Sequence, residues 1–368
     1  MALAASPTRS APDARHAWTL GELEQIFATR DFAAPWVDLN DKVVMVTGGT
    51  GSFGNEFVRL VSERYRPRKL IVFSRDELKQ YEMAQRFPAE RFPFMRYFIG
   101  DVRNRDRLEL AMRGVDYVIH AAAMKQVPTA EYNPFECIHT NVLGAENIVT
   151  AAIRTNVKRV VALSTDKAAN PINLYGASKL ASDKIFVAGN NLAGADGPRF
   201  CVVRYGNVAG SRGSVIPFFL KLAQEGATSI PITDERMTRF WITLKQGVDF
   251  VLSSLALMRG GEIFVPKIPS TRIVEIADLV APGLEQRVVG IRPGEKLHEV
   301  MVPLDDGRTT LELSDRYVIT PTFVGWSREP YLANGARTVG DGFSYASDSN
   351  PERLDARALQ SLLEKSFS

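Results

Sequence analysis

A short apolar segment followed directly by a glycine-rich turn constrains the fold of this chain more than any other feature. The segment KVVMV (42–46) has the composition of a buried strand, and the turn TGGTGSFG (47–54) follows it with three glycines at intervals of three residues. Such a turn lets the backbone approach a pyrophosphate, which then lies at the N-terminus of the next helix, expected to begin near Asn55. Because glycine-rich turns are common between strands and helices, the motif needs support from its surroundings.

Strand and helix patterns continue to alternate after this turn. Such alternation predicts an α/β fold with a doubly wound parallel sheet of the Rossmann type and right-handed crossovers. A helix is expected from about Asn141 to Asn156, ahead of the strand that carries Ser164. The expected strands are LIVF (70–73), MRYFIG (95–100), DYVIH (116–120), VVALS (160–164) and FCVVRYGNV (200–208).

Three regions are expected along the chain. Residues 1–38 form an N-terminal extension, rich in Ala, Ser, Pro and Arg, that we expect to be partly disordered, with a short helix where Thr19 and Glu22 form a capping box. A transit peptide is the less favoured interpretation of the extension. Residues 39–205 are expected to form the Rossmann domain, with later strands returning near 240–268. Residues 206–368 are mainly a smaller C-terminal substrate-binding domain and a tail, which ends in the amphipathic helix pattern ERLDARALQSLLEK with Leu354, Leu359, Leu362 and Leu363.

Composition narrows the classes of function. A formal net charge of +3 over 368 residues gives no reason to expect a nucleic acid or a membrane surface as partner. No apolar run approaches the ~20 residues of a membrane span. Cys137 and Cys201 lie in apolar surroundings, which predicts reduced core residues of a cytoplasmic protein. The 4 histidines are scattered without ligand spacing, so no metal site is expected.

The segment STDKAANPINLYGASK (164–179) carries the candidate chemistry. Tyr175 and Lys179 are four residues apart and share one face of a helix. A nearby cation lowers a phenol pKa by roughly 1–3 units, from about 10 to roughly 7–9, so Tyr175 is a candidate general base. Tyr65 and Lys69 have the same spacing, but a proline between them spoils a helical turn, and we interpret that pair as surface.

Asp166 and Lys167 precede this pair at the end of a strand. By themselves they are typical of a solvated strand end. Beside Tyr175 they supply a second acid and a second base, which is more than an alcohol oxidation requires. The pattern therefore indicates chemistry beyond hydride transfer.

The second strand ends where an NAD-binding protein usually offers a carboxylate to the ribose. This chain has Ser74 and Arg75 there, with Lys79 a helical turn further on, which suits a 2′-phosphate and favours NADP over NAD. Asp76 and Glu77 weaken that preference.

The third and fourth strands lead to further candidate cofactor contacts. Asp101 follows the third strand and is placed to bind an adenine amine, whereas capping is its ordinary role. Ala121 to Ala123 leave room for a flat cofactor across the strand ends. Lys125 follows at the point where the strand order would reverse, which is where such folds bind ligands.

Cations recur in the second half of the chain. Arg212, Arg239, Arg292 and Lys296 are scattered among prolines and glycines, in segments that we expect to be loops. Any one arginine is more often a surface charge. Together they favour a substrate with a diphosphate, such as a nucleotide sugar.

A set of long motifs gives the chain a family resemblance. From about Asp41 to Asp305, with a looser echo in FSYASDSN (343–350), it resembles the inverting UDP-N-acetylglucosamine 4,6-dehydratases of pseudaminic acid biosynthesis, within the extended short-chain dehydrogenase/reductase family. The resemblance implies tightly held NADP, UDP-N-acetylglucosamine as substrate and a homo-oligomer, either dimer or hexamer. The motifs are TGGTGSFG, FSRDELKQYEM, GDVR, HAAAMKQVP, STDKAANPINLYGASK, RYGNV, GSRGSVIPFF, MTRFWITL, IFVPKIPS and IRPGEKLHEVM.

The resemblance also implies roles for the catalytic residues. Tyr175 would deprotonate the 4-hydroxyl of the sugar, with Lys179 supporting it and Thr165 orienting the hydroxyl. Lys167 would then take the C5 proton while Asp166 protonates the departing 6-hydroxyl. Dehydratases that retain C5 carry Asp-Glu at this pair, so the lysine is the discriminating residue.

The binding positions follow from the same motifs. Those assigned to the cofactor are Gly48, Thr50, Gly51, Ser52, Phe53, Gly54, Ser74, Arg75, Asp76, Lys79, Asp101, Val102, Ala121, Ala123, Lys125, Asn141, Tyr175 and Lys179. Those assigned to the substrate are Lys125, Thr165, Tyr175, Asn207, Val208, Arg212, Arg239, Arg292 and Glu295.

Two other functions stay open. One is an NADP-dependent nucleotide-sugar epimerase, or a dehydratase of another N-acetylated 6-deoxysugar pathway. The other is a non-catalytic NADP-binding regulator, against which the intact set of catalytic residues argues. Departures from the family pattern, Met124 and Asn104, touch none of the proposed chemistry, and the N-terminal extension has no readable function.

Overall fold

The computed structural model describes residues 19–32, 34–211, 213–323 and 325–359. The expected N-terminal disorder falls mostly on residues 1–18, outside the described residues. Arg212 also lies outside them, as do Leu362 and Leu363 of the expected C-terminal helix.

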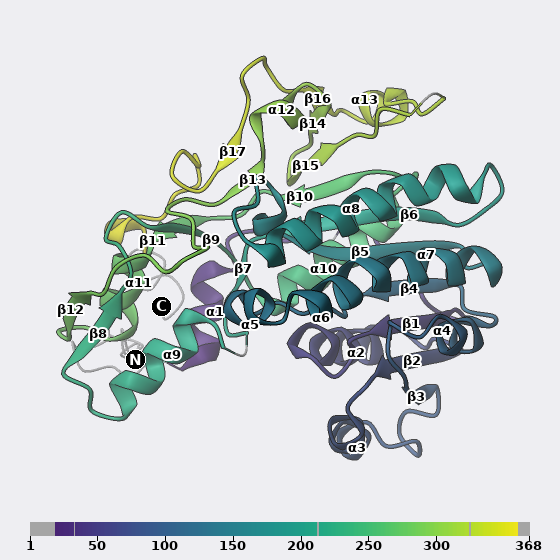
Figure 1. Cartoon of the computed structure of the whole chain (residues 1–368), viewed down its shortest axis with the longest axis horizontal. Helices are drawn as coiled ribbons and strands as arrows, with labels where there is room; N and C mark the ends of the chain where they lie inside the picture. The colour runs from purple at the N-terminus through teal and green to yellow at the C-terminus, as the bar shows by residue number, and fades with distance from the viewer. Residues whose placement is uncertain (1–18, 33, 212, 324, 360–368) are drawn as a thin grey trace, which may run out of the picture.

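A large sheet with a parallel core organises the molecule (Figure 1). Its strand order is β16-β14-β15-β10-β6-β5-β4-β1-β2-β3. Neighbours from β10 to β3 in this order pair in parallel, whereas β14, β15 and β16 join the sheet through antiparallel pairs. This confirms the Rossmann-type fold. The strands are β1 (Val43–Thr47), β2 (Lys69–Ser74), β3 (Met95–Ile99), β4 (Tyr117–His120), β5 (Arg159–Thr165), β6 (Arg199–Tyr205), β10 (Ile263–Pro266), β14 (Thr310–Glu312), β15 (Arg316–Ile319) and β16 (Arg337–Thr338).

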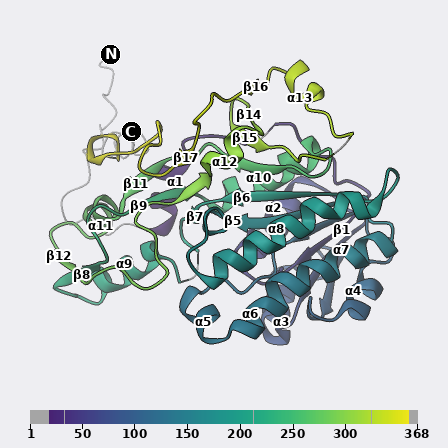
Figure 2. The same cartoon turned by 45° about the horizontal axis from the view of Figure 1, so that its top comes forward.

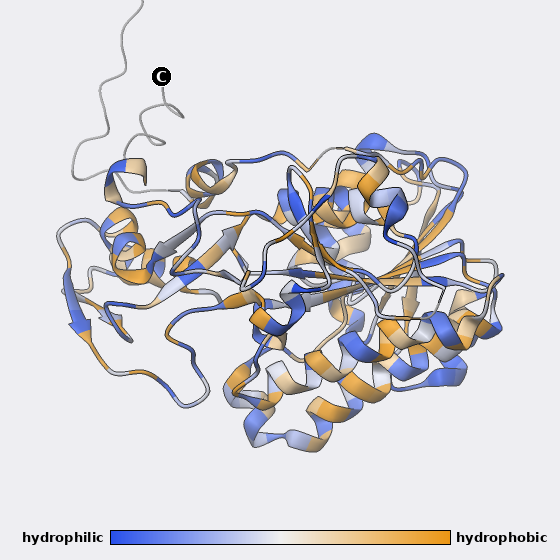
Figure 3. Ribbon diagram, turned by 90° about the horizontal axis from the view of Figure 1, so that it is seen from above, coloured by the Kyte–Doolittle hydropathy of each residue, from blue (hydrophilic) through white to orange (hydrophobic). Residues whose placement is uncertain are grey.

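Helices cover both faces of this sheet. The helices α7 (Gly144–Arg154) and α8 (Leu174–Ala193) lie in front of it in Figure 1, next to α4 (Arg105–Met112). Behind the sheet, α10 (Leu244–Leu257) packs against α2 (Ser52–Arg64). Hydrophobic and hydrophilic residues alternate around these helices (Figure 3), as expected when one side of each helix is buried. No helix of the described ranges is long and apolar enough to cross a membrane.

Three small sheets follow the Rossmann strands, and they gather beside the main sheet with α1, α9 and α11 (Figure 2). A second hydrophobic core lies there, in which Phe27 of α1 stacks on Trp241 with ring centroids 5.4 Å apart. The Thr19–Glu22 capping box that begins α1 is confirmed. The elements are α1 (Leu20–Phe27), β7 (Asn207–Val208), α9 (Val215–Gln224), β8 (Ser229–Ile232), β9 (Thr238–Ile242), β11 (Ser270–Arg272), α11 (Ile273–Val280), β12 (Glu285–Val288), β13 (Val300–Val302) and β17 (Tyr345–Ala346).

The remaining helices lie between strands along the chain. A π-helix at His139–Leu143 joins α6 to α7, so the helix expected near Asn141 begins with a wider turn. At the C-terminal end of the described chain, Leu359 is buried in the second core. The connecting helices are α3 (Glu77–Arg86), α5 (Val127–Tyr132), α6 (Pro134–Ile138), α12 (Leu304–Gly307) and α13 (Glu329–Ala333).

The structure corrects several expected boundaries. The first Rossmann helix begins at Ser52, since Gly51 is already its N-cap, and not near Asn55. The strand expected over 200–208 is broken after β6, and its last residues form β7 of another sheet. The segment MTRFWITL is not a loop, because it contains β9, which is buried along its whole length.

Two expectations about single side chains can also be compared with the structure. Tyr65 is not a surface residue: it is 9% exposed and packs in the main core, although Lys69 is exposed. Cys137 and Cys201 are free and buried, as expected.

Candidate active site

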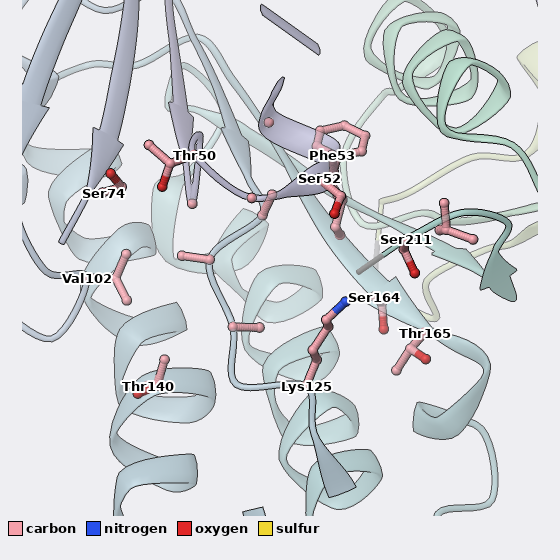
Figure 4. Close-up of a pocket in the computed structure, with 18 of the residues that line it drawn as sticks. Thr50, Ser52, Phe53, Ser74, Val102, Lys125, Thr140, Ser164, Thr165 and Ser211 are labelled. Atoms are coloured by element: carbon pink, nitrogen blue, oxygen red, sulfur yellow. The ribbon is translucent and has the colours of Figure 1, made fainter. Parts of the chain in front are cut away.

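A cavity of about 600 Å³ lies at the carboxyl ends of the parallel strands, from the glycine turn to the segment 164–179 (Figure 4). Most of the predicted cofactor residues line it, together with four residues of the proposed chemistry, Thr165, Lys167, Tyr175 and Lys179. The sequence interpretation assigned no role to nine further lining residues, most of which lie inside the quoted motifs. These are Phe73, Gly100, Thr140, Leu163, Ser164, Tyr205, Gly206, Ser211 and Leu244.

The glycine turn forms one end of this cavity, and its shape fits a dinucleotide. Gly48 has φ +65°, and a Cβ there would lie 2.8 Å from the backbone nitrogen of Ala122. A Cβ on Gly54 would lie 2.3 Å from the carbonyl oxygen of Gly49. Gly48 and Gly54 therefore cannot carry a side chain without displacing the backbone nearby. The turn leads into the N-terminus of α2, where N–H groups and the helix dipole favour a phosphate.

The predicted NADP-selecting residues lie at the rim of this end. The Arg75 side chain is 59% exposed, and its Nη1 is 3.6 Å from Oδ2 of Asp101. The Lys79 Nζ lies 2.8 Å from Oδ2 of Asp76, so the acidic residue that weakened the NADP prediction is paired with a cation. Burial would raise the pKa of Asp101, but hydrogen bonds from Arg103 outweigh burial and lower it.

Asn141 does not line the cavity but supports its wall. Its side-chain nitrogen donates to the carbonyl of Met124 at 3.0 Å and to Oγ of Ser178 at 2.9 Å, while its oxygen accepts from the N–H of Met124 at 2.9 Å. These bonds tie the π-helix to the loop that presents Lys125. Figure 4 shows the Lys125 side chain directed toward Ser164 and Thr165, and burial lowers the pKa of its amine.

Tyr175 and Lys179 lie on α8 at the other end of the cavity, 9% and 3% exposed. Burial lowers the pKa of Lys179, which Asp183 partly opposes. Burial also raises the pKa of Tyr175 to about 12, although Lys167 and a hydrogen bond with Thr165 act in the other direction. The expected lowering to 7–9 is therefore wrong for this state of the pocket, and the cation that acts on the phenol is Lys167.

A cluster of buried charges adjoins the tyrosine. The Lys167 Nζ donates to Oδ1 of Asp166 at 3.1 Å and lies 3.3 Å from Oε1 of Glu299. Asp166 is fully buried, and its Oδ1 also accepts from the Thr165 hydroxyl at 2.9 Å. Burial alone would lower the pKa of Lys167, but the charges of Asp166 and Glu299 outweigh burial and raise it. Lys167 is thus held as an ammonium in contact with Asp166.

The predicted substrate residues divide into two groups. Val208 lines the cavity, whereas Asn207, which precedes it on β7 and is partly buried, is not among the lining residues. Arg239, Arg292 and Glu295 are not among the lining residues. Arg239 lies buried on β9, where its guanidinium donates to the backbone carbonyls of 238, 296 and 297. Arg292 is 63% exposed and 3.8 Å from Glu295.

Glu299 is the charged residue that the sequence interpretation missed. It stands in the motif IRPGEKLHEVM, whose cations were noted, but one glutamate among several carries no signal of its own. Glu299 and Lys167 are close in space although more than one hundred residues separate them in the sequence. Rules based on the spacing of neighbouring residues cannot predict such a contact. Among the described residues, no group of three or more His, Cys, Asp or Glu side chains could hold a metal ion.

Known proteins resemble this chain over most of its length. Two Campylobacter jejuni proteins named UDP-N-acetylglucosamine 4,6-dehydratase (inverting) are 58% and 54% identical to it, over 85% and 88% of this chain and 94% and 98% of their own. A Rickettsia canadensis protein named UDP-glucose 4-epimerase is 41% identical over 88% of this chain and 95% of its own.

Solved structures share the fold. Pen from Bacillus thuringiensis superposes with a TM-score of 0.80 at 33% identity, covering 89% of this chain and all of that one. The dTDP-glucose 4,6-dehydratase DesIV of Streptomyces venezuelae, solved with NAD, gives a TM-score of 0.62 at 26% identity, over 69% of this chain and 86% of that one. The family described as polysaccharide biosynthesis protein matches residues 44–321. The chain therefore belongs to this family of short-chain dehydrogenase/reductase enzymes.

Proposed function

We propose that the protein is an NADP-dependent UDP-N-acetylglucosamine 4,6-dehydratase that inverts C5 and yields a UDP-4-keto-6-deoxy-L-sugar for pseudaminic acid or related glycan synthesis. The observation that carries the proposal is the contact between Lys167 and Asp166 beside Tyr175, at one end of a cavity whose other end suits a dinucleotide. The two Campylobacter relatives support the substrate and the reaction. A nicotinamide cofactor, held by the glycine turn and by Tyr175 and Lys179, would supply the hydride chemistry, with hydride taken from C4 and given back to C6.

Tyr175 starts the reaction as the base for the 4-hydroxyl. A phenol whose pKa is about 12 is a weak base near neutral pH, so the nearby cations must favour its phenolate during the proton transfer. Lys167 already acts in this direction, and Lys179 lies one turn along the same helix. Thr165, which lines the cavity beside them, orients the hydroxyl.

Asp166 and Lys167 carry out the elimination. Transfer of one proton from the Lys167 ammonium to the Asp166 carboxylate, across 3.1 Å, produces a neutral amine and a carboxylic acid together. The amine then takes the C5 proton, which the new 4-ketone has acidified, and the acid gives its proton to the leaving 6-hydroxyl. Water leaves, and the ammonium and carboxylate are restored. As hydride is added at C6, C5 takes a solvent-derived proton on the face opposite to the one that Lys167 deprotonated, which inverts C5. This proton balances the one that Tyr175 took from the 4-hydroxyl and releases to solvent.

The substrate diphosphate is assigned to the cationic side of the cavity. Lys125 lines it, and Arg239 and Arg292 come from the part of the chain that follows the Rossmann strands. We propose that residues 39–205 form the cofactor domain, with strands near 240–268 returning to it, and that 206–368 serve mainly the substrate. Since Arg239 and Arg292 do not line the cavity as it stands, their contact with substrate requires the segment 291–297 to shift.

An apolar surface supports the proposed homo-oligomer. Tyr132, Phe135 and Ile138 are 88%, 75% and 38% exposed on the adjoining helices α5 and α6. Exposed apolar groups that lie together are typical of an interface between proteins. Sedimentation of Tyr132→Ser/Phe135→Ser at low concentration should give a smaller species than the wild type.

One experiment tests the reaction. Purified protein is incubated with UDP-N-acetylglucosamine in D₂O, and the product is examined by NMR. We expect a 4-keto-6-deoxy sugar that carries deuterium at C5 and is inverted there. A product that keeps the 6-hydroxyl and differs only at C4 would instead identify an epimerase, whose reaction has no use for Asp166 and Lys167. A product with the original C5 configuration would contradict the base role of the lysine.

A further inference from the structure

Glu299 is a buried carboxylate, one residue before β13, that contacts Lys167 but does not itself line the cavity. Its Oε1 lies 3.3 Å from Lys167 Nζ and 3.8 Å from Nε of Arg239. Its Oε2 lies 3.9 Å from Nζ of Lys296 and has no hydrogen-bond partner within the described part of the chain. Burying a carboxylate without hydrogen bonds is unfavourable unless nearby cations compensate. The cations that face it include the residue proposed as the C5 base.

The backbone of Glu299 is held by a segment far along the chain. Its N–H donates to Oγ of Ser347 at 2.9 Å, and its carbonyl accepts from the N–H of Ser347 at 2.8 Å. The Ser347 hydroxyl also lies 2.6 Å from that of Thr238, which begins β9, and the Ser347 carbonyl accepts from Ser270 at 2.7 Å. The motif FSYASDSN (343–350), which the proposed reaction does not otherwise use, therefore fixes Glu299 beside the strand that carries Arg239.

Lys167 needs such a partner at one point of the proposed reaction. When the amine takes the C5 proton, Asp166 must still hold its own proton for the 6-hydroxyl, so the aspartate is neutral as the ammonium begins to form. Glu299 is then the nearby carboxylate that carries a charge. A fixed carboxylate stabilises charge that develops in the transition state, and more so in a pocket that excludes water.

We propose that Glu299 is a positioning residue for the C5 step: its carboxylate fixes the position of the Lys167 amine and stabilises the ammonium as it forms. This inference rests on the proposed function and deepens it. The charged and titratable groups that face Lys167 are Asp166, Glu299, Arg239 and Tyr175, while Lys296 faces Glu299 from the other side. The arrangement assigns the C-terminal motif a task in catalysis although it lies outside the Rossmann strands.

The first test measures Lys167 directly and requires no substrate. The full chain with its bound cofactor is labelled with ¹³C at lysine Cε, and the Lys167 signal is identified by its loss in Lys167→Met. In the wild type we expect this amine to stay charged to the highest pH at which the fold survives. In Glu299→Gln its titration midpoint should fall by about one unit or more, which is a tenfold loss of proton affinity.

The matched control is a substitution that removes another glutamate–lysine ion pair elsewhere in the fold. Glu312 lies 2.8 Å from Lys267 Nζ outside the cavity, so Glu312→Gln should leave the Lys167 titration unchanged. If Glu299→Gln also leaves it unchanged, the inference is overturned. Ser347→Ala should shift the titration in the same direction as Glu299→Gln but by less, because it loosens the backbone and keeps the carboxylate.

The second test separates the two halves of the reaction in a single turnover with UDP-N-acetylglucosamine. In Glu299→Gln the near-ultraviolet absorbance of reduced nicotinamide should appear at the wild-type rate and then persist, with elimination slowed about 10²-fold, the lower range for a proton-transfer group. Glu299→Asp should recover part of that loss. Loss of the absorbance rise as well would show a merely structural role and overturn the inference. If the wild type makes no product, the proposed function fails, and the titration still decides the link between Glu299 and Lys167.

Discussion

The two ends of the cavity are built in different ways. At the glycine end, the inner wall is one continuous turn, Thr47 to Gly54, with the alanines that follow β4 opposite, and charged side chains that follow β2 and β3 lie at the rim. At the lysine end, buried charges meet from three distant segments: Asp166 and Lys167 after β5, Arg239 on β9, and Glu299 before β13.

This difference separates binding from chemistry. A backbone turn at a helix N-terminus offers fixed N–H groups that need no partner side chain, so it suits a ligand that is held throughout. The pKa of a buried charged group depends strongly on the charge of its neighbours. A change of protonation at one group therefore shifts the pKa of the next, which suits proton transfer. Substitutions at the lysine end should therefore change rates, whereas substitutions at the glycine end should change cofactor affinity and stability.

The largest effect is expected from Lys167→Ala. It removes the C5 base and the proton that Asp166 needs, so product formation should fall about 10⁴-fold, the upper range for proton-transfer groups. Oxidation at C4 should continue, and stopped-flow absorbance should show reduced nicotinamide accumulating on the enzyme. Normal turnover in this variant would show that another residue is the C5 base. It would also contradict the assignment of the chemistry to the lysine end.

A slightly smaller loss is expected from Tyr175→Phe, which deletes only the phenolic oxygen. We expect turnover to fall by about 10²–10⁴-fold, with no reduced nicotinamide formed because C4 oxidation is the first step. Substrate binding, measured by calorimetry, should persist. Tyr65→Phe is the matched control, since it has the same spacing to a lysine but lies in the core behind the sheet, and equal losses in both variants would show that spacing had misled the assignment.

Arg75→Ala probes the rim of the glycine end. Charge-assisted hydrogen bonds are worth about 1.5–3 kcal/mol, and this side chain is exposed, so we expect about a tenfold loss of NADP affinity. NAD affinity should hardly change, and turnover with saturating NADP should stay near that of the wild type. Both affinities can be measured by fluorescence titration. The 2′-phosphate assignment would be wrong if NAD bound the wild type as tightly as NADP.

The smallest effect on turnover is expected from His120→Gln. His120 is buried next to the start of the glycine turn, where its Nδ1 lies 2.8 Å from the Thr47 hydroxyl. Burial, with a further contribution from Lys179, lowers its pKa to about 3. Because the unfolded chain binds a proton near pH 6.5 and the folded chain does not, stability is full above that pH and falls as pH drops toward 3. The slope is at most about 1.4 kcal/mol per pH unit. Denaturant unfolding of His120→Gln between pH 7 and pH 4 should lose this part of the slope.

The same difference explains what the sequence could predict. Gly48, Ser74, Tyr175 and Lys179 lie within short motifs, where the order of strand, turn and helix dictates the geometry, and the structure brings all four to one cavity. Arg239 was expected in a loop because it was read among prolines and glycines, but it lies on β9, where its neighbours Phe240 and Trp241 are buried with it. Burial is a property of the assembled fold, as is the pKa of Tyr175, so local spacing gave the wrong sign for that shift.

Helix α1 precedes the residues that match the family, yet it is packed into the fold. The polysaccharide biosynthesis match begins at residue 44, yet Leu23, Ile26 and Phe27 of α1 are buried against Trp241 and its neighbours. A chain trimmed to the family boundary would expose that apolar surface to water and invite self-association. For anyone producing the enzyme, the first usable residue is therefore set by the helix cap at Thr19, well ahead of the first Rossmann strand.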